Sequence, residues 1–551
     1  MKRLAGWVLA VLMIMPRPAY AIDGELDRTF GFRGKVVSGS SPYRLAIQSN
    51  GKIIVAGATD DGRQDFVVAR FNGDGSPDSS FGKAGKVTTD LSGHNDYVTA
   101  LSIQPDGRIV VAGVVGKVGG GQWPWRFGLA RYNSDGSLDS SFGIGGKVTT
   151  AFSDYQDAAS ALTIQSDGKI VVSGWTWGWT SGNGNPRTRF VLARYNHDGS
   201  LDATFGNGGK VIADTPARPV GVEIGPDNKI LVAGGASMNP SKKFDELSDC
   251  LQFWSVSDAD FVLLRYNPDG APDASFGVGG IVTADFGELH DYIYSFRIQS
   301  DGKIIVAGLT GEAALIVPCD AASYNNSRFT LARYNSNGSL DSDFGNQGIV
   351  TTNFSGSLNE WAGAVAIQSD GKIVVTGGAF AVNPDDPNNN KLFDAVFRYN
   401  RDGSLDPSFG AGGKVTPPLS RPTVAVQSDG KIVLAGRELI PRQGWDFVLA
   451  RYDNDSSPSL YPADVRRGDE FTFKFPAAVR NTTYLDVRFR SPGSAADQVA
   501  LNWQLGVSAE HTVPLDVTAG VWIVTGVRTH EDPNDHGGAF IDVSLPLIVK
   551  P

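Results

Sequence analysis

Hydrophobic and polar residues alternate along the chain in short runs that fit β-strands better than helices. One stretch shows the pattern clearly: apolar runs at 161–165, 170–174, 190–195 and 209–212 are separated by polar segments rich in Gly, Asp and Asn. Short apolar runs between such segments are typical of strands, and the Asp167-Gly168 pair predicts a tight hairpin between the first two. The stretch therefore predicts four consecutive strands, called A, B, C and D in this section.

Three sequence phrases recur seven times in the same order and show that this four-strand unit is repeated. Their period is about 63 residues, and a period of this length indicates a repeat architecture. The phrase Phe-Gly…Gly-Lys-Val begins at Phe30, Phe81, Phe142, Phe205, Phe276, Phe344 and Phe409. The phrase Ile-Gln-Ser-Asp-Gly-Lys-Ile has its turn residue at Gly51, Gly107, Gly168, Asn228, Gly302, Gly371 and Gly430. The phrase Ala-Arg-Tyr-Asn has its arginine at Arg70, Arg131, Arg194, Arg265, Arg333, Arg398 and Arg451.

Seven four-stranded units predict an all-β fold, a seven-bladed β-propeller. A β-helix is the rival, but its repeats are shorter and lack these hairpins. The last copy loses its Phe-Gly phrase after Tyr452, whereas the chain opens with an extra strand D at 34–37. The N-terminal strand is therefore expected to complete blade seven and close the ring, which also removes open sheet edges.

The three phrases resemble those of the delta-60 repeat family over residues 26–455. The resemblance implies an exported bacterial protein with a propeller-like array. It implies no reaction, so it assigns no catalytic residue to this chain.

Residues 456–551 lack the repeat and are expected to form a separate domain. Short alternating runs, such as 470–475 and 484–489, lie between polar turns. This pattern suggests an immunoglobulin-like β-sandwich, although the Cys-Trp-Cys pattern of antibody domains is missing. The domain order is then a leader at 1–21, a propeller at 22–455 and a sandwich at 456–551.

The first 21 residues have the pattern of a signal peptide. Lys2 and Arg3 precede a short apolar run, and Ala19-Tyr20-Ala21 fits a cleavage site. We expect cleavage after Ala21 and a secreted or periplasmic protein. The run is too short to serve comfortably as a membrane anchor, and no later segment is apolar enough to span a bilayer.

Composition narrows the classes of protein further. Glycine accounts for 67 of the 551 residues, which disfavours a helical protein, and an apolar fraction of 41% excludes global disorder. The formal net charge is −10 and excludes a nucleic-acid partner, which needs a basic surface. Removing Lys2, Arg3 and Arg17 with the leader would make the charge −13.

The B–C segments vary most between copies and are the predicted ligand-binding face, since variable loops on a rigid scaffold commonly carry binding. Exposed aromatic rings there could stack on sugars, or they could simply pack the loops onto the propeller rim. The candidate ligand-binding tryptophans are Trp123, Trp125, Trp175, Trp177, Trp179 and Trp254.

Acidic residues recur just before strand A, at the expected mouth of the central channel. These candidate ligand-binding carboxyl groups are Asp96, Asp157, Asp291 and Glu360. They could bind a cation or a polar ligand, or they could cap backbone amides of the inner strand. Recurrence in several copies favours the structural role.

The sequence names no cofactor, and calcium is the one ion it leaves open. The segment 133–139 spaces its oxygens like a calcium loop but also fits an Asx-stabilised turn. Cys250 and Cys319 are the only cysteines and are expected to form a disulfide in an exported protein, with two free thiols as the alternative. His530 and His536 lie in an acidic segment without a clear third metal ligand.

These patterns predict a binding scaffold rather than a defined enzyme. The expected partner is an extracellular or periplasmic glycan or protein, bound at the B–C face. The alternative is a polysaccharide hydrolase or lyase that uses the carboxyl groups of the channel mouth as acid and base.

Overall fold

The computed structural model is all-β over the residues that it describes. These are residues 26–453 apart from 28, 33, 39–40, 60–63, 117–124, 180–185, 214, 216, 238–258, 285–289, 312–326, 354–359, 382–390 and 441–443, and eight strands beyond 453. By their contacts, residues 23–454 form one compact unit, and the strands beyond residue 455 belong to a second. The two units are described separately.

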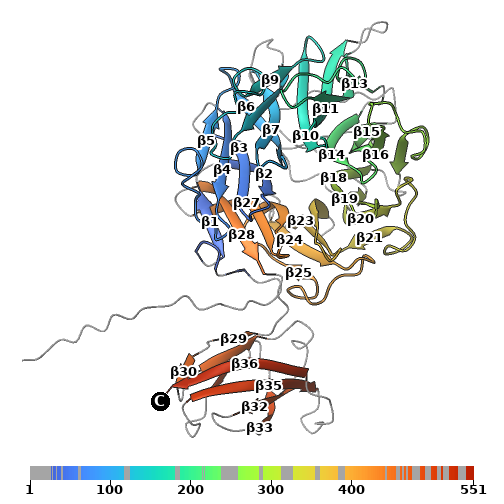
Figure 1. The fold of residues 1–551 in the computed structure, drawn as a ribbon. Helices are drawn as coiled ribbons and strands as arrows, with labels where there is room; N and C mark the ends of the chain where they lie inside the picture. The colour runs from blue at the N-terminus through green and yellow to red at the C-terminus, as the bar shows by residue number, and fades with distance from the viewer. Residues whose placement is uncertain are drawn as a thin grey trace, which may run out of the picture. The chain divides into compact units, whose positions relative to one another are not determined.

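Seven four-stranded antiparallel sheets surround a central axis, so the predicted seven-bladed propeller is confirmed (Figure 1). Each blade places its strands from the centre outwards in chain order, except the last, whose outer strand comes from the N-terminus. The innermost strands are β2 (Ser41–Ile47), β6 (Asp96–Ile103), β10 (Gln156–Ile164), β14 (Ala217–Ile224), β18 (His290–Ile298), β22 (Glu360–Ile367) and β26 (Ser420–Val426).

The remaining strands follow outwards in three layers. The second layer is β3 (Ile53–Ala58), β7 (Ile109–Val115), β11 (Ile170–Trp179), β15 (Ile230–Ser237), β19 (Ile304–Gly311), β23 (Ile373–Ala381) and β27 (Ile432–Ile440). The third is β4 (Phe66–Phe71), β8 (Arg126–Tyr132), β12 (Pro186–Tyr195), β16 (Ala259–Tyr266), β20 (Arg328–Tyr334), β24 (Lys391–Tyr399) and β28 (Gly444–Tyr452). The outermost is β5 (Lys86–Thr89), β9 (Lys147–Thr150), β13 (Lys210–Ile212), β17 (Ile281–Ala284), β21 (Ile349–Thr352), β25 (Lys414–Val415) and β1 (Lys35–Ser38).

The ring is closed as predicted, because β1 pairs with β28 on the outside of blade seven. The register runs antiparallel from Lys35 opposite Ala450 to Ser38 opposite Phe447. Two segments about 400 residues apart in sequence therefore share one sheet. This pairing covers the outer edge of β28, which would otherwise lie open to association with other chains.

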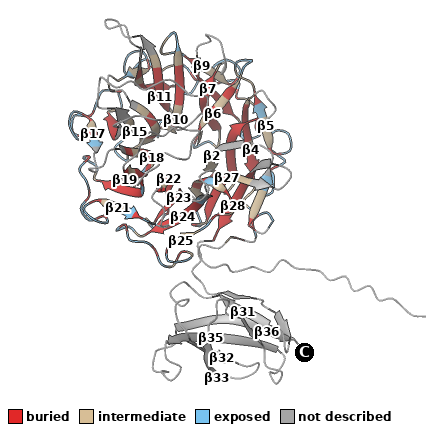
Figure 2. Cartoon of the chain, turned by 180° about the vertical axis from the view of Figure 1, so that it is seen from behind, coloured by how far each residue is buried: buried red, intermediate tan, exposed pale blue. Residues whose placement is uncertain are grey.

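The core consists of the faces between neighbouring blades, and buried residues fill the middle of each sheet (Figure 2). The phenylalanine of the Phe-Gly phrase is central to it, since all seven copies are completely buried. Phe142, for example, packs with Leu129 and Tyr195 of adjoining blades. Burial of one such side chain contributes about 1.5 to 3 kcal/mol to the hydrophobic stabilisation of the fold.

A buried arginine beside each phenylalanine connects the blades. In blade two, Arg131 Nε donates to Asp139 Oδ2 at 2.8 Å, and its guanidinium carbon lies 4.5 Å from the centre of the Phe142 ring. Arg131 Nη1 also donates to the backbone carbonyl of His197 in blade three. Because the other copies repeat the Arg–Asp pair at 2.6 to 2.8 Å, the Ala-Arg-Tyr-Asn phrase marks a structural element.

The segment 133–139 is organised as turns and ion pairs. Asp135 Oδ1 accepts hydrogen bonds from the amide and hydroxyl of Ser137 at 2.9 and 2.6 Å, which is an Asx-type turn. The Asp139 carboxylate is held by Arg131 and Arg108. This geometry supports the turn interpretation over a calcium loop.

Glycine is required in the Phe-Gly phrase because the backbone there is left-handed and crowded. Gly143 has φ of 53°, and a Cβ atom would lie 2.2 Å from the carbonyl oxygen of Lys147. Gly145 in the same loop has φ of 59°, but a Cβ atom added there would meet open space. The two positions therefore separate backbone strain from steric conflict.

We expect Gly143→Ala to lower the free energy of unfolding by about 2 kcal/mol or more, and Gly145→Ala by about 1 kcal/mol, because only the first adds a clash to the left-handed strain. Urea denaturation of both variants measures the difference. Equal losses would contradict the steric argument.

The strands beyond residue 455 form two sheets. One has the order β29 (Ser459–Tyr461), β31 (Glu470–Lys474) and β34 (Glu510–Thr512). The other has the order β30 (Asp464–Arg466), β36 (Ile541–Lys550), β35 (Gly520–His530), β32 (Tyr484–Arg490) and β33 (Gln498–Gln504). The β30–β36 pair is parallel.

Candidate functional site

The tryptophans predicted in the B–C loop of blade three lie on a strand instead. Strand β11 continues to Trp179 and pairs with β12, placing Trp175 opposite Phe190 and Trp177 opposite Thr188. The sequence Trp-Thr-Trp-Gly-Trp alternates with a period of two, and aromatic residues favour strands. The hairpin is therefore longer than predicted, and Trp175 and Trp177 share one face of the sheet.

Trp175 is the buried base of an aromatic cluster. It is 6% exposed and contacts Val114 and Ala158. Its ring meets that of Trp125 edge-on, with ring centres 6.1 Å apart. Arg218 on β14 of the next blade also contacts this ring, with its guanidinium carbon 4.5 Å from the Trp175 ring centre. Trp175 is therefore explained by packing between blades, which is the kind of structural role that the sequence left open for these tryptophans.

Trp177 and Tyr155 form the accessible part of the cluster. Their ring centres are 6.0 Å apart and the rings are nearly perpendicular. Trp177 is half-buried, and Tyr155 keeps 43% of its surface exposed. Two fixed, partly exposed rings provide a surface on which a sugar ring or another flat apolar group can stack. We call Trp125, Tyr155, Trp175, Trp177 and Arg218 the tryptophan cluster.

Polar contacts hold the rim of the tryptophan cluster in place. Arg126 Nη1 donates to the carbonyls of Trp125 at 2.8 Å and Tyr155 at 3.3 Å. The same nitrogen lies 3.6 Å from Asp157 Oδ2. Burial lowers the pKa of Arg218 to about 9, which leaves it charged at neutral pH.

The four predicted carboxyl groups lie at the start of inner strands, within the strands themselves. Asp96 and Asp157 have no exposed surface, and Asp291 and Glu360 have 1% and 2%. Asp157 Oδ2 accepts hydrogen bonds from the amides of Phe152 and Ser153 at 2.7 and 3.2 Å. Its other oxygen accepts from Thr176 Oγ1 at 2.5 Å. This carboxylate fixes the link between blades two and three.

Asp96 has the same role one blade earlier. It accepts hydrogen bonds from the amides of Leu91 and Ser92, at 2.7 and 3.3 Å, and from the Ser92 hydroxyl. Burial raises its pKa. Asp65, Asp90 and Asp96 bring carboxyl oxygens within 4.8 Å of one another, the one such acidic group among the described residues. Asp96 and Asp157 therefore cap backbone amides, which is the structural role predicted. The capped amides belong to the link before each inner strand, whereas the prediction was amides of the strand itself.

Several predicted site residues fall outside the described part of the chain. These are Trp123, Trp254, Cys250 and Cys319. Trp179 is placed on β11 by its backbone alone. The disulfide therefore remains a prediction.

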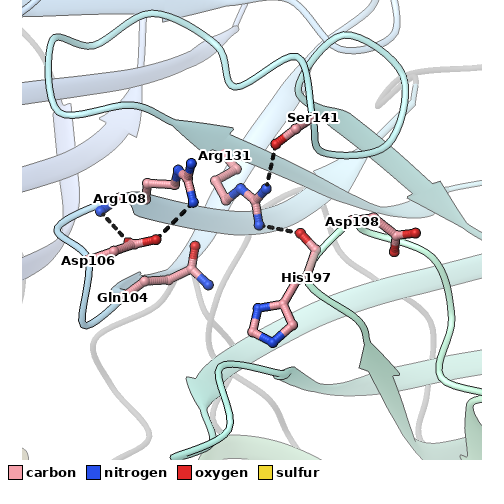
Figure 3. Close-up of a pocket in the computed structure, with 7 residues that line it drawn as sticks. All are labelled: Gln104, Asp106, Arg108, Arg131, Ser141, His197 and Asp198. Carbon is pink, nitrogen blue, oxygen red and sulfur yellow. Dashed lines mark hydrogen bonds and ion pairs between the residues drawn. The ribbon is translucent and has the colours of Figure 1, made fainter.

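A polar recess of about 250 Å³ lies between blades two and three, on the side of the A–B turns (Figure 3). Arg108 there pairs with Asp106 at 2.8 Å and with Asp139 at 3.1 Å, while Arg131 Nη1 donates to the backbone carbonyl of His197. These groups belong to the structural contacts that the blades repeat, so the recess is a weaker candidate than the tryptophan cluster.

Sequence reasoning missed Tyr155 and Arg126 as members of the site. Tyr155 lies in the link before β10, and Arg126 is the first residue of β8. The signal available was the period-two alternation of the tryptophans, which predicts one shared face. Residue 155 reaches that face because it directly precedes Gln156, which the pairing of β10 with β11 places opposite Trp177. The sequence alone does not show that this pairing extends so far.

Comparison with known families supports a repeat β-propeller. The model described as "Domain of unknown function (DUF5122) beta-propeller" matches residues 48–81, 104–142, 165–205, 252–276, 320–344, 368–409 and 427–458. The model of the WD domain, G-beta repeat, matches residues 85–117. No curated protein sequence matches the chain.

Solved structures with a similar arrangement belong to proteins of different kinds. The polysaccharide lyase Uly1 is 11% identical, with a TM-score of 0.41 over 80% of this chain and 94% of that one. An ulvan lyase bound to a glucuronate–sulfated rhamnose unit is 12% identical, with a TM-score of 0.43 over 79% and 96%. A putative glucose dehydrogenase from Thermus thermophilus is 15% identical, with a TM-score of 0.30 over 64% and 96%. Within the described residues, no helix has the length and apolarity needed to cross a membrane.

Proposed function

Since the chain is a repeat β-propeller with partly exposed aromatic rings fixed at one place, we propose that it is an exported scaffold that binds a glycan at the tryptophan cluster. The observation that carries the proposal is the Tyr155–Trp177 pair, two rings held perpendicular beside charged hydrogen-bonding groups. Sugar rings present apolar faces that stack on aromatic side chains and hydroxyls that need polar partners. A protein partner is the alternative occupant.

The finer assignments belong to the same proposal. The three repeated phrases support delta-60 repeats, and the leader at 1–21 supports secretion or a periplasmic location. The two sheets beyond residue 455 support an immunoglobulin-like sandwich that acts as a spacer or second module. Cys250 and Cys319 are proposed to form a disulfide in that compartment.

A polysaccharide-cleaving activity is the second candidate, favoured by the proximity of Asp65, Asp90 and Asp96 and by the raised pKa of Asp96. A raised pKa suits a general acid. Against it, Asp96 has no exposed surface and caps backbone amides, so it does not reach a substrate in this arrangement. Binding without turnover is therefore the better-supported function.

We expect Trp177→Ala to weaken glycan binding about tenfold, since it removes one ring of the stacking surface. A glycan array screened with the full chain identifies a ligand, and calorimetry then compares the variant. Phe393→Ala is the matched control, because Phe393 is 43% exposed on β24 in another blade. Equal binding by wild type and Trp177→Ala, with both folded, would argue against this site.

A further inference from the structure

The carboxylate of Asp157 joins the two chain segments that carry the accessible rings of the tryptophan cluster. Asp157 lies on β10 opposite Thr176 of β11, and the Thr176 hydroxyl donates to its Oδ1 at 2.5 Å. Its Oδ2 accepts hydrogen bonds from two amides of the link between β9 and β10, one of them that of Ser153. Trp177 directly follows Thr176, and Tyr155 is two residues after Ser153. One carboxylate therefore holds the backbone beside both rings.

The Ser153 hydroxyl connects the two ring-bearing residues directly. Its oxygen accepts a hydrogen bond from the Tyr155 amide at 3.1 Å. Its hydrogen is shared between two acceptors, the Trp177 carbonyl at 3.2 Å and Asp157 Oδ1 at 3.0 Å. The backbones of Tyr155 and Trp177 are thus fixed relative to each other by one side chain, and the perpendicular contact of their rings follows from this placement.

Arg126 ties the other side of Tyr155 to the same carboxylate. Its Nη1 donates to the Tyr155 carbonyl at 3.3 Å and lies 3.6 Å from Asp157 Oδ2. Asp157 has no exposed surface, so it does not reach a bound ligand itself. Any effect of this carboxylate on binding must therefore pass through the residues that it holds.

Blade two contains the same arrangement of hydrogen bonds without the pair of rings. The Ser92 hydroxyl donates to Asp96 Oδ1 at 2.7 Å and accepts from the amide of His94 at 3.3 Å. His94 thus takes the place that Tyr155 has in blade three. In addition, β7 ends opposite Asp96, whereas β11 continues beyond the residue opposite Asp157. The chain therefore supplies its own control for the contacts around the rings.

We propose that Ser153 and Asp157 are positioning residues of the tryptophan cluster, which hold Tyr155 and Trp177 in the arrangement on which a sugar ring stacks. This inference rests on the proposed glycan-binding function and explains how that site is kept ready for its ligand. Rings that are fixed in advance bind more tightly than rings that a ligand must first order.

The first test needs no ligand and uses the full chain labelled with 5-fluorotryptophan. The Trp177 signal in the fluorine NMR spectrum is assigned by its loss in Trp177→Phe. Ser153→Ala is expected to shift or broaden this signal by more than its linewidth, because the hydroxyl between the Tyr155 amide and the Trp177 carbonyl is lost. Ser92→Ala, the matched variant in blade two, is expected to leave the signal unchanged.

The second test measures binding on one array that holds neutral, uronate-containing and sulfated polysaccharides. For the printed glycans that the wild type binds, Ser153→Ala is expected to lower the affinity about fivefold, because the glycan must then order the rings itself. Ser92→Ala is expected to bind as the wild type does. Asp157→Ala and Asp96→Ala form a second matched pair, in which the first alone is expected to lose affinity. If either aspartate variant fails to fold, the serine pair decides.

The outcomes distinguish this inference from the proposed function. An unmoved Trp177 signal in Ser153→Ala would overturn the inference, and so would a moved signal with unchanged affinity. Equal losses of affinity in Ser153→Ala and Ser92→Ala would also overturn it, because general destabilisation would then explain both. Glycan binding at the cluster stands in all three cases if Trp177→Ala weakens it. No binding by the wild type would overturn the proposed function and, with it, the inference that depends on it.

Discussion

Replacing Asp27 with alanine is expected to lower the free energy of unfolding by about 3 to 5 kcal/mol, because it leaves buried positive charge without its carboxylate. Asp27 is 1% exposed. Its Oδ2 accepts hydrogen bonds from Arg451 Nε at 2.8 Å and Lys431 Nζ at 2.6 Å, and Thr29 donates to Oδ1. Urea denaturation followed by tryptophan fluorescence measures the loss.

This substitution acts where the ring closes. In the other blades the Arg–Asp partners are 8 residues apart, whereas Arg451 and Asp27 are 424 apart. The backbone joins them too, since the Asp27 amide donates to the Arg451 carbonyl at 2.7 Å. Loss of the carboxylate therefore weakens the attachment of β1 to β28, and hydrogen exchange in these two strands is expected to accelerate.

Asp202→Ala is the matched comparison within a continuous blade. Asp202 makes the same contacts with Arg194 and Lys169, at 2.8 and 2.9 Å, but bridges no chain ends. It is expected to destabilise blade three while leaving exchange in β1 and β28 as in the wild type. A loss of less than about 1 kcal/mol for Asp27→Ala, as for an exposed ion pair, would contradict the assigned role in closure.

The fold was predictable because its determinants are local and repeated. The phrase around Asp139, Ser141 and Phe142 has its counterpart at Asp27, Thr29 and Phe30, before the first inner strand. Because this phrase and its strand stand ahead of the first complete four-strand unit, the sequence predicts that the N-terminal strand completes the last blade and closes the ring. The complete burial of arginines such as Arg398, at 0% exposure, was not predicted, although an Asp eight residues later was visible in six of the seven copies.

The candidate site was predicted less completely, because it depends on contacts between blades. The sequence identified Trp175 and Trp177 but placed them in a loop, and the strand that carries them is extended by pairing with β12. It also identified Asp96 and Asp157 without their burial, which follows from packing against the preceding link. Composition gives no means of placing Tyr155 opposite Trp177.

Acidification below pH 4 is expected to unfold the propeller cooperatively, because a carboxylate in each blade has its pKa lowered in the folded state. Burial alone would raise the pKa of Asp27, but hydrogen bonds from Lys431 and Thr29 outweigh it and lower the pKa to about 2. The same balance, with Lys372, Ser408 and Arg398 as partners, lowers that of Asp406 to about 2. The pKa is also lowered for Asp78, Asp139, Asp202, Asp273 and Asp341.

The direction of the effect follows from linkage between protonation and folding. A carboxyl group whose pKa is lower in the folded than in the unfolded chain stabilises the fold above the unfolded pKa of 3.8. That stabilisation is lost as the pH falls from about 4 towards 2, through the folded pKa. Asp27 and Asp406 are 1% and 4% exposed, and each then accounts for about 2 kcal/mol.

Among the carboxyl groups in the described part of the chain, four oppose this trend, because burial raises their pKa: Asp96, Glu223, Asp394 and Asp453. Their protonation favours the folded state, so they offset part of the loss. The seven lowered groups outnumber them and lie in the repeated geometry of every blade, which makes net destabilisation in acid the expected result. Urea denaturation midpoints measured at pH 5, 4, 3 and 2 test this prediction, because the series covers the pKa of the carboxyl groups in both the folded and the unfolded chain.

The variant Asp406→Asn separates this mechanism from general acid repulsion. It removes one titrating carboxylate and is expected to be less stable than the wild type at pH 7, since Arg398 loses its charged partner at 2.7 Å. Between pH 4 and 2 it has one group fewer to protonate, so its stability must fall less steeply. Parallel pH profiles for the two proteins would show that the buried ion pairs do not govern acid unfolding, and that repulsion among the remaining positive charges does.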